Sequence, residues 1–295
     1  MKLLVATDFS RASPTIETIK ARPWPAGTEV CALHVVDLPP FEPGAELLET
    51  ARRGAELVVK SIAGDLERSG FKTQAEVVIG HPRTAIPEFA KKWGADFIVI
   101  GSHGAHGLAR FLLGSTARSV VRAAPCSVEV ARSGVKNPGS GAGSGWKVLL
   151  ATDGSDCAKA AARSVAERPW PSGTSVRIAS AVAPFMPIAD AGMAYFEASR
   201  AAEVAREVEA EMRSRAVEAI AEAEKILRQA NMERIEKTEP MSGDPKRTIV
   251  DGASKWGATM IVVGSHGRRG LDRLMMGSVS EFVVTHAHCS VEVIR

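Results

Sequence analysis

The amino-acid sequence predicts an α/β protein with two similar doubly wound domains, each a five-stranded parallel sheet with helices on both faces. Short apolar strand patterns alternate with helical patterns, which is typical of βαβ units. Strands such as Phe97–Ile100 are apolar throughout, as in sheets covered on both faces. The second half of the chain repeats the first, and 295 residues suit two domains.

The repeat also predicts the domain boundaries. Lys2–Asp8 resembles Lys147–Asp153, and residues 80–132 align without a gap onto residues 243–295. Between the copies, a stretch with five glycines and a proline is typical of a flexible linker. We therefore expect a first domain at 1–133, a linker at 134–145 and a second domain at 146–295.

The elements follow in order along each copy. In the first half we expect strands at 2–7, 28–36, 73–79, 96–101 and 126–130, and helices at 11–20, 44–68, 83–92 and 115–123. In the second half we expect strands at 147–152, 174–182, 233–239, 259–264 and 289–294. Right-handed crossovers then give a doubly wound order. The last strand of each half should lie at a sheet edge, and because exposed edges invite pairing, we expect these two edges to pair within the chain.

One helix should be much longer in the second half. The chain uses 58 positions from Phe185 to Gly243, against 39 from Phe41 to Gly80. A stripe at helical spacing runs through this region: Val204, Val208, Met212, Ala216, Ile220, Ala223 and Leu227. Such a helix should reach beyond its own sheet. Two interpretations stay open: it packs on its own or the sister domain, or its free end contacts a second chain.

Composition and charge exclude several classes of protein. Apolar residues make up 45% and aromatic residues 5%, which favours aliphatic cores. A net charge of +3, with both signs interspersed, argues against a nucleic-acid surface. No apolar run is long enough to span a membrane, and the N-terminus lacks a signal-peptide layout. The scattered cysteines fit a reducing cytoplasm best: Cys31, Cys126, Cys157 and Cys289.

Two glycine-rich turns carry the candidate chemistry. Gly101-Ser-His-Gly104 is followed nine residues later by Gly114-Ser115, and the second half repeats this spacing from Gly264 to Ser278. Each turn lies between a buried strand and a helix start, where backbone amides can hold an anion. Glycine there permits positive φ and lets a phosphate approach the backbone. The aspartate that ends each first strand would repel phosphate. It could instead accept hydrogen bonds from ribose hydroxyls or from the adenine amino group, or take part in metal binding.

On these residues, both halves resemble universal stress protein domains, and the chain resembles a tandem member of that family. The family's ATP-binding pattern is glycine, two residues, glycine, nine residues, then glycine with serine or threonine, and both copies satisfy it. The resemblance implies a first site at Ala6, Thr7, Asp8, Val35, Ile100, Gly101, His103, Gly104, Gly114, Ser115 and Thr116. It implies a second site at Ala151, Thr152, Asp153, Ala181, Val263, Gly264, His266, Gly267, Gly277, Ser278 and Val279.

The implied ligand is ATP, ADP or AMP, with Mg²⁺ bound through the phosphates and no metal site in the protein itself. The copies differ where Ala181 replaces Val35, where Val279 replaces Thr116, and where Arg268 and Arg269 replace Ala105 and His106. We therefore expect two sites of unequal affinity. His103 and His266 could contact phosphate or serve as local hydrogen-bond partners, while His286, His288 and Cys289 make a weak metal candidate.

The resemblance also implies a regulatory protein acting through conformation or through an unidentified protein partner, rather than an enzyme. No P-loop sequence is present, and neither loop holds an evident base for water. Slow Mg²⁺-dependent ATP hydrolysis and a ligand-free adaptor stay open as alternatives. Association of whole chains into a homo-oligomer, such as a dimer of tandem chains, is expected in the cytoplasm.

Overall fold

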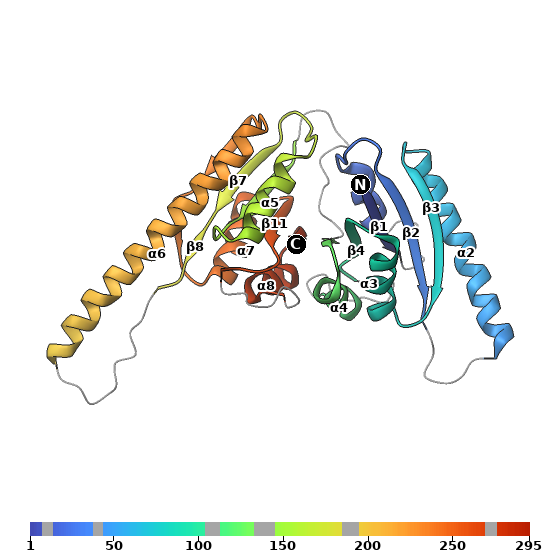
Figure 1. Ribbon diagram of the computed structural model, residues 1–295, viewed down its shortest axis with the longest axis horizontal. Helices are drawn as coiled ribbons and strands as arrows, with labels where there is room; N and C mark the ends of the chain where they lie inside the picture. Colours follow the sequence, from blue (N-terminus) through green and yellow to red (C-terminus); the bar gives the residue numbers. More distant parts are fainter. Residues whose placement is uncertain (8–13, 38–43, 104–112, 133–144, 185–194, 269–275) are drawn as a thin grey trace.

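The computed structural model describes residues 1–7, 14–37, 44–103, 113–132, 145–184, 195–268 and 276–295. These form two α/β halves side by side (Figure 1), and their strands join one ten-stranded sheet in the order β3-β2-β1-β4-β5-β12-β11-β6-β7-β9. The first half contains β1 Lys2–Thr7, α1 Pro14–Ala21, β2 Glu29–Val36, α2 Ala45–Glu67, β3 Lys72–Ile79, α3 Pro82–Trp93, β4 Phe97–Gly101, α4 Ser115–Ala123 and β5 Ser127–Ala131.

The second half repeats this order with two short additional strands. It contains β6 Lys147–Ala151, α5 Asp156–Ala166, β7 Ser175–Ala179, β8 Ala181–Val182, α6 Tyr195–Gln229, β9 Arg234–Lys237, β10 Met241–Ser242, α7 Pro245–Trp256, β11 Met260–Gly264, α8 Ser278–His286 and β12 Ser290–Ile294. The single strand expected at 174–182 is wrong, because the chain leaves the β7 ladder at Ser180, and β8 pairs with β10 in a separate two-stranded sheet. The strand expected at 233–239 is also shorter in the structure, where β9 spans only Arg234–Lys237.

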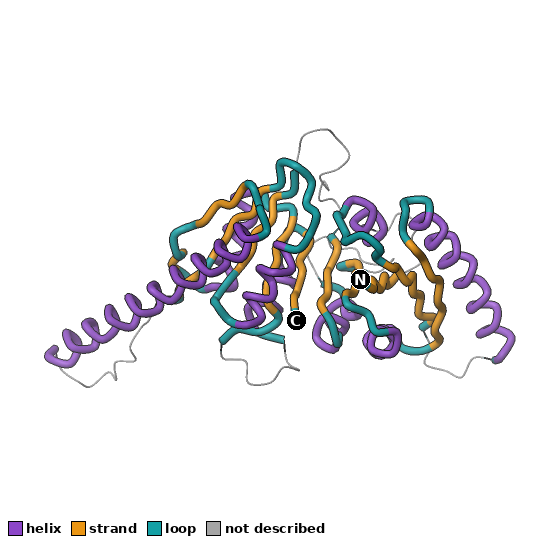
Figure 2. The backbone as a smooth tube through the Cα atoms, turned by 45° about the horizontal axis from the view of Figure 1, so that its top comes forward, coloured by secondary structure: helices purple, strands orange, loops and turns teal. Residues whose placement is uncertain are grey.

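Alternate side chains of the strands enter two aliphatic cores, one on each face of the sheet. Leu4 and Ala6 pack in one core, and Leu3 and Val5 pack in the other. Helices α1, α2, α5 and α6 cover one face, and α3, α4, α7 and α8 cover the other (Figure 2). The doubly wound prediction is therefore confirmed.

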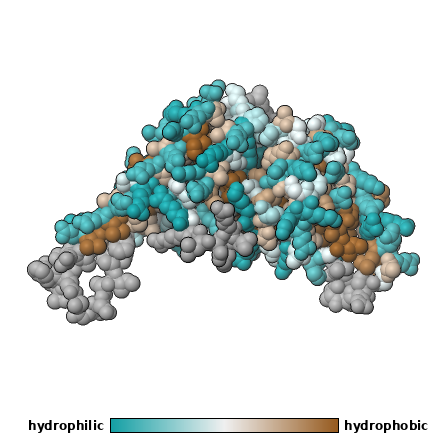
Figure 3. Space-filling view, in the orientation of Figure 1, coloured by the Kyte–Doolittle hydropathy of each residue, from teal (hydrophilic) through white to brown (hydrophobic). Residues whose placement is uncertain are grey.

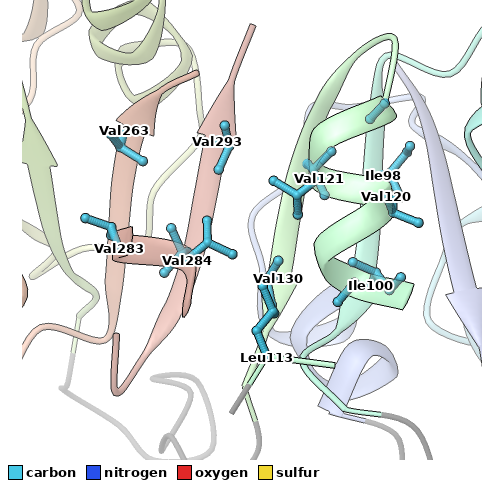
Figure 4. Packing of buried hydrophobic residues seen from close by; sticks show 14 of the residues in the cluster. Ile98, Ile100, Leu113, Val120, Val121, Val130, Val263, Val283, Val284 and Val293 are labelled. Carbon is cyan, nitrogen blue, oxygen red and sulfur yellow. The ribbon is translucent and has the colours of Figure 1, made fainter. Parts of the chain in front are cut away.

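The two halves meet at β5 and β12, which pair antiparallel with Glu129 opposite Glu292. The predicted pairing of the two edge strands within one chain is confirmed. Valines on β11, β12 and α8 belong to the same buried cluster as residues of β4, β5 and α4 (Figure 4), so one apolar core crosses the boundary between the halves. Most of the predicted linker lies outside the described residues.

A buried ion cluster lies on the other face of this junction. Arg22 contacts both Glu129 and Glu292, Arg168 contacts Glu292, and all four side chains are almost completely buried. Burial lowers the pKa of Arg22 to about 10 and that of Arg168 to about 9, and it raises the pKa of Glu129. The guanidinium of Arg22 lies 5.3 Å from the ring centre of Trp146. Two positive and two negative charges therefore neutralise one another between the domains.

Two equivalent arginines, one from each half, make matching contacts across the same junction, which gives it an approximate twofold symmetry. Arg132 donates to the backbone oxygens of Val284 and Thr285 at the C-terminus of α8. Arg295 donates to the corresponding oxygens of Val121 and Arg122 on α4. Each arginine thus satisfies the unpaired carbonyls at the end of the other half's last helix.

Helix α6 is the largest departure from the repeat. It spans 35 residues, against 23 in α2, and its N-terminal part projects away from the sheet (Figure 1). The predicted stripe is buried only in its C-terminal half, at Ala216, Ile220, Ala223 and Leu227. Apolar surface shows over the projecting part of α6 and near α2 (Figure 3), and the exposed large apolar side chains among the described residues are Leu47, Leu57, Ile79, Val204 and Val217.

Candidate functional site

A cavity of about 900 Å³ opens in the second half at the carboxyl ends of β6 and β11. These strands are neighbours, and the strand order reverses between them, which is where ligands bind in doubly wound sheets. All the positions that the sequence predicted for this half line the cavity: Ala151, Thr152, Asp153, Ala181, Val263, Gly264, His266, Gly267, Gly277, Ser278 and Val279.

Asp153 joins the two loops at the mouth of this cavity. Its Oδ1 accepts a hydrogen bond from the backbone N–H of Ser155 at 3.0 Å, and its Oδ2 accepts one from the backbone N–H of Arg268 at 3.1 Å. The Ser155 hydroxyl caps α5 and donates to the backbone oxygen of His266 at 3.2 Å. The turn after β6 and the turn after β11 are thus held in contact.

The glycines of the pattern are required because neighbouring atoms lie too close to their Cα atoms to leave room for a side chain. A Cβ on Gly267 would lie 2.7 Å from Asp153 Oδ2, and a Cβ on Gly264 would lie 2.7 Å from the backbone carbon of Cys157. Neither these two residues nor Gly277 has positive φ. The positive-φ part of the sequence argument is therefore wrong for these three positions, since it is the missing side chain that matters there.

The first turn of α8 forms another wall of the cavity. Gly277 precedes the helix and donates from its backbone N–H to the oxygen of Ser265 at 2.8 Å. Ser280 Oγ donates to the same oxygen at 3.0 Å, which fixes the helix start against the β11 turn. No side chain caps α8, so the amides of its first turn and the helix dipole favour an anion here.

His266 presents a neutral imidazole to this wall. Its Nδ1 lies 2.8 Å from Ser265 Oγ, and Nε2 has no hydrogen-bond partner among the described residues. Burial, assisted by the charge of Arg295, lowers the pKa of His266. At neutral pH the ring therefore offers a hydrogen bond rather than a positive charge.

The first half repeats the geometry of the glycine turn in its described part. Gly114 donates to the Ser102 oxygen at 2.8 Å, and Ser102 Oγ lies 3.0 Å from His103 Nδ1. Ala6 and Thr7 end β1, Val35 lies on β2, Ile100 and Gly101 end β4, and Ser115 and Thr116 begin α4. Asp8 and Gly104 lie outside the described residues.

Several residues near the two sites escaped the sequence reasoning. Arg83, in the first turn of α3, donates to Ser115 Oγ at 2.9 Å. In the second half, α6 contributes part of the cavity wall through Met212, Arg215 and Ala216. Met212 and Ala216 belong to the predicted apolar stripe, so the periodicity of this helix could have indicated that they face the interior. Further lining residues are Ala158, Ser180, Val182, Ala183, Pro245, Ile249, Arg268, Met276 and Ser280.

The histidine-rich segment near the C-terminus has local hydrogen bonds. His286 Nδ1 lies 2.9 Å from the backbone oxygen of Phe282, and His288 Nε2 lies 3.1 Å from that of Ala258. Within the described ranges, no group of three or more His, Cys, Asp or Glu side chains could hold a metal ion. In the same part of the chain, every helix is too short or too polar to cross a membrane.

Comparisons with known proteins give one consistent result. The model of the universal stress protein family matches residues 1–132 and 146–295. A universal stress protein of Methanocaldococcus jannaschii is 37% identical over 142 residues, covering 44% of this chain and 81% of the relative. One from Mycobacterium bovis is 26% identical over 249 residues, covering 82% of this chain and 77% of the relative. The structure of a universal stress protein from Archaeoglobus fulgidus is 22% identical to this chain and aligns with it at a TM-score of 0.63. The alignment covers 100% of this chain and 96% of the other, and it shows the same fold.

Proposed function

The chain belongs to the universal stress protein family, and on that premise we propose that it binds an adenine nucleotide in each domain. The ligand is ATP, ADP or AMP, and the protein acts as a regulator in the stress response. One observation supports this most strongly. Residues chosen from the sequence for phosphate, ribose and adenine contact line a single cavity, although they come from separate strands, helices and turns.

The chemistry of the cavity fits such a ligand. The bare backbone at Gly264 and Gly267 and the uncapped start of α8 suit phosphate oxygens. Asp153 has two acceptor oxygens whose remaining lone pairs suit ribose hydroxyls. Ala151, Ala181 and Val263 provide an apolar surface for a base. Mg²⁺, where present, would be held through the nucleotide phosphates.

We propose binding without fast turnover. Asp153 is the one carboxylate among the described residues that line the cavity, and both its oxygens already accept backbone hydrogen bonds. A carboxylate used in this way is poorly placed to activate water. Single-turnover kinetics with Mg-ATP tests the alternative, because hydrolysis within seconds would show that the protein is an enzyme.

Isothermal titration calorimetry of the full chain tests the binding itself. We expect two equivalents of nucleotide per chain for the wild type and one for Gly267→Val, whose side chain would displace the Asp153 carboxylate. Gly252→Ala is the matched control, because this position lies on α7 in ordinary contact with Met241, and it should keep two equivalents. Absence of binding heat in the wild type would refute the proposal.

Association of chains forms a further part of the proposal. The projecting part of α6 exposes Val204 at 45%, so it can contact a second copy or another protein in the cytoplasm. Light scattering on a variant with residues 198–211 deleted should report a smaller particle than the wild type. An unchanged particle size would exclude α6 from the association.

A further inference from the structure

Two arginines add positive charge to the second-half cavity. Arg215 reaches the cavity from α6, and Arg268 follows the turn after β11. Asp153 is the one acidic side chain among the described lining residues. Since the pKa of His266 is lowered by burial, the lining carries more positive than negative charge at neutral pH.

The Arg268 side chain lies over the Asp153–Gly154 turn. A Cβ on Gly154 would lie 2.7 Å from Arg268 Nη2 and 3.1 Å from the Cβ of Ala219 on α6. Gly154 also has φ of +76°, so the bare, left-handed turn makes room for the guanidinium. No carboxylate pairs with Arg268 in the part of the chain that the structure describes. This positive charge is therefore available to a ligand.

Arg215 lies on the same side of α6 as Ala219. The two residues are one helical turn apart, so their Cβ atoms are about 6 Å apart. Arg215 lines the cavity, and its Nε donates to Glu211 at 2.8 Å. The Arg268 guanidinium thus lies against the turn that carries Asp153, the acceptor for ribose hydroxyls, and Arg215 adds a second guanidinium to the same cavity from α6.

The first copy has neither arginine. Helices α2 and α6 end alike, with Phe71 N donating to Leu66 O and Met232 N donating to Leu227 O. Counting back from these ends places Gly54 where α6 has Arg215, and the buried residues agree in register: Ala55, Val59, Ile62 and Leu66 with Ala216, Ile220, Ala223 and Leu227. In the sequence, Ala105 stands for Arg268 and Phe9 for Gly154. These three differences between the copies all concern the part of the site around the turn after the first strand of each half.

The cavity therefore offers two separate places for anions. One is the start of α8, where the nucleotide's 5′-phosphates belong under the proposed function. The other is the Arg268 guanidinium beside the ribose acceptor Asp153, with Arg215 lining the same cavity from α6. In dinucleotide-binding proteins a carboxylate binds a free ribose hydroxyl, whereas a nearby arginine accommodates a phosphate on the 2′ oxygen. Guanidinium groups bind phosphate with paired hydrogen bonds. Asp153 would therefore bind the ribose hydroxyl that carries no phosphate, and arginine would bind the additional phosphate.

Resting on the proposed function, we propose that the second-half site selects an adenine nucleotide with an additional phosphate on the ribose 2′ or 3′ oxygen. The first-half site takes simple adenine nucleotides. The arginine at position 215 of α6 and the residue after Gly267 then set ligand choice, whereas the glycine pattern is common to both sites.

Calorimetry on the full chain with Gly114→Val, which blocks the first site, tests this proposal. The probes are adenosine 5′-phosphate, adenosine 2′,5′-bisphosphate and adenosine 3′,5′-bisphosphate. One bisphosphate should bind at least about tenfold more tightly than the monophosphate, as one charge-assisted contact allows. Arg268→Ala should abolish this advantage and Arg215→Ala should reduce it. Arg228→Ala is the control, because Arg228 lies on α6 in the same kind of ion pair as Arg215 but does not line this cavity, and it should change neither affinity.

The outcomes separate this inference from the proposed function. Equal affinity for mono- and bisphosphates would overturn the inference and leave nucleotide binding intact. A bisphosphate advantage that survives in Arg268→Ala would overturn it as well, as would an Arg268→Ala variant that loses ATP affinity alone. Failure of every probe and of ATP to bind would refute the proposed function itself. Circular dichroism of each variant confirms that the fold is retained.

Discussion

The two copies match where they meet and differ where they would bind ligand. At the junction, Arg22 and Arg168, Glu129 and Glu292, and Arg132 and Arg295 occupy equivalent places and make related contacts. At the carboxyl ends of the strands, Arg215 of α6 lines the second-half cavity, whereas the aligned residue of α2 is Gly54, and the helix length differs by several turns. Residues at the junction are each other's partners, so a change in one copy affects both. The described residues that line the second-half cavity all belong to that copy, so a change there should affect one site.

The largest expected effect comes from the buried ion cluster at the junction. Glu292→Ala leaves Arg22 and Arg168 with one carboxylate in a site that excludes water. Removing one partner of a buried ion pair costs about 3–5 kcal/mol. Urea unfolding should show a loss of this size. The control is Glu281→Ala, which breaks the exposed Arg122–Glu281 pair between the same halves and should cost about 1 kcal/mol or less.

The two helix-end contacts should be nearly equivalent. Arg132→Ala and Arg295→Ala each remove a charged donor to two helix-terminal carbonyls, which is worth about 1.5–3 kcal/mol. Similar losses in the free energy of unfolding would support the approximate twofold relation. A loss confined to one variant would show that the halves do not share the junction equally.

Arg83 should matter to the first site more than its counterpart matters to the second. It donates to Ser115 at the start of α4, so it lies where a phosphate would be held. In a Gly267→Val background, Arg83→Ala should weaken ATP binding about tenfold. Lys246→Ala, at the equivalent position of the second copy, is the control and should leave this first-site affinity unchanged. An unaltered affinity in Arg83→Ala would assign this arginine to local structure.

The smallest expected effect is a pH dependence from His266. Its pKa is lowered below the ordinary value of 6.5, so the folded state resists a proton that the unfolded state accepts. The contribution to stability is present above the unfolded-state pKa of about 6.5, and it is lost as the pH falls from there through the lower folded-state pKa. His266→Asn should lose stability less steeply on acidification than the wild type. His286→Asn, on the exposed end of α8, should follow the wild-type curve.

The fold could be predicted from the sequence because its signals are local. Continuous apolar strands, Pro82 and Pro245 at helix starts and glycines after α3 and α7 each act within a few residues. The repeat then supplied the topology and the edge pairing. In the second half, the predicted positions that line the cavity are those that the resemblance to universal stress proteins implied, and the glycine pattern carried that resemblance.

What could not be predicted depends on contacts between distant residues. Arg22 and Glu292 are 270 positions apart, and no local pattern indicates that their side chains meet. Arg215 lines the cavity only because of the register in which α6 packs, which periodicity alone does not fix. The end of the β7 ladder before Ser180 depends on the pairing of β8 with β10, a strand of two residues that lies far away in the sequence.

We propose that one chain holds two nucleotide sites that share a glycine pattern but differ around it. Native mass spectrometry of the intact chain titrated with ATP counts bound nucleotides directly. We predict species with one and with two nucleotides, and a singly bound species that accumulates beyond a binomial distribution because the sites are unequal. Binomial populations would contradict the inequality of the sites, and a chain that never binds a second nucleotide would contradict the two-site account.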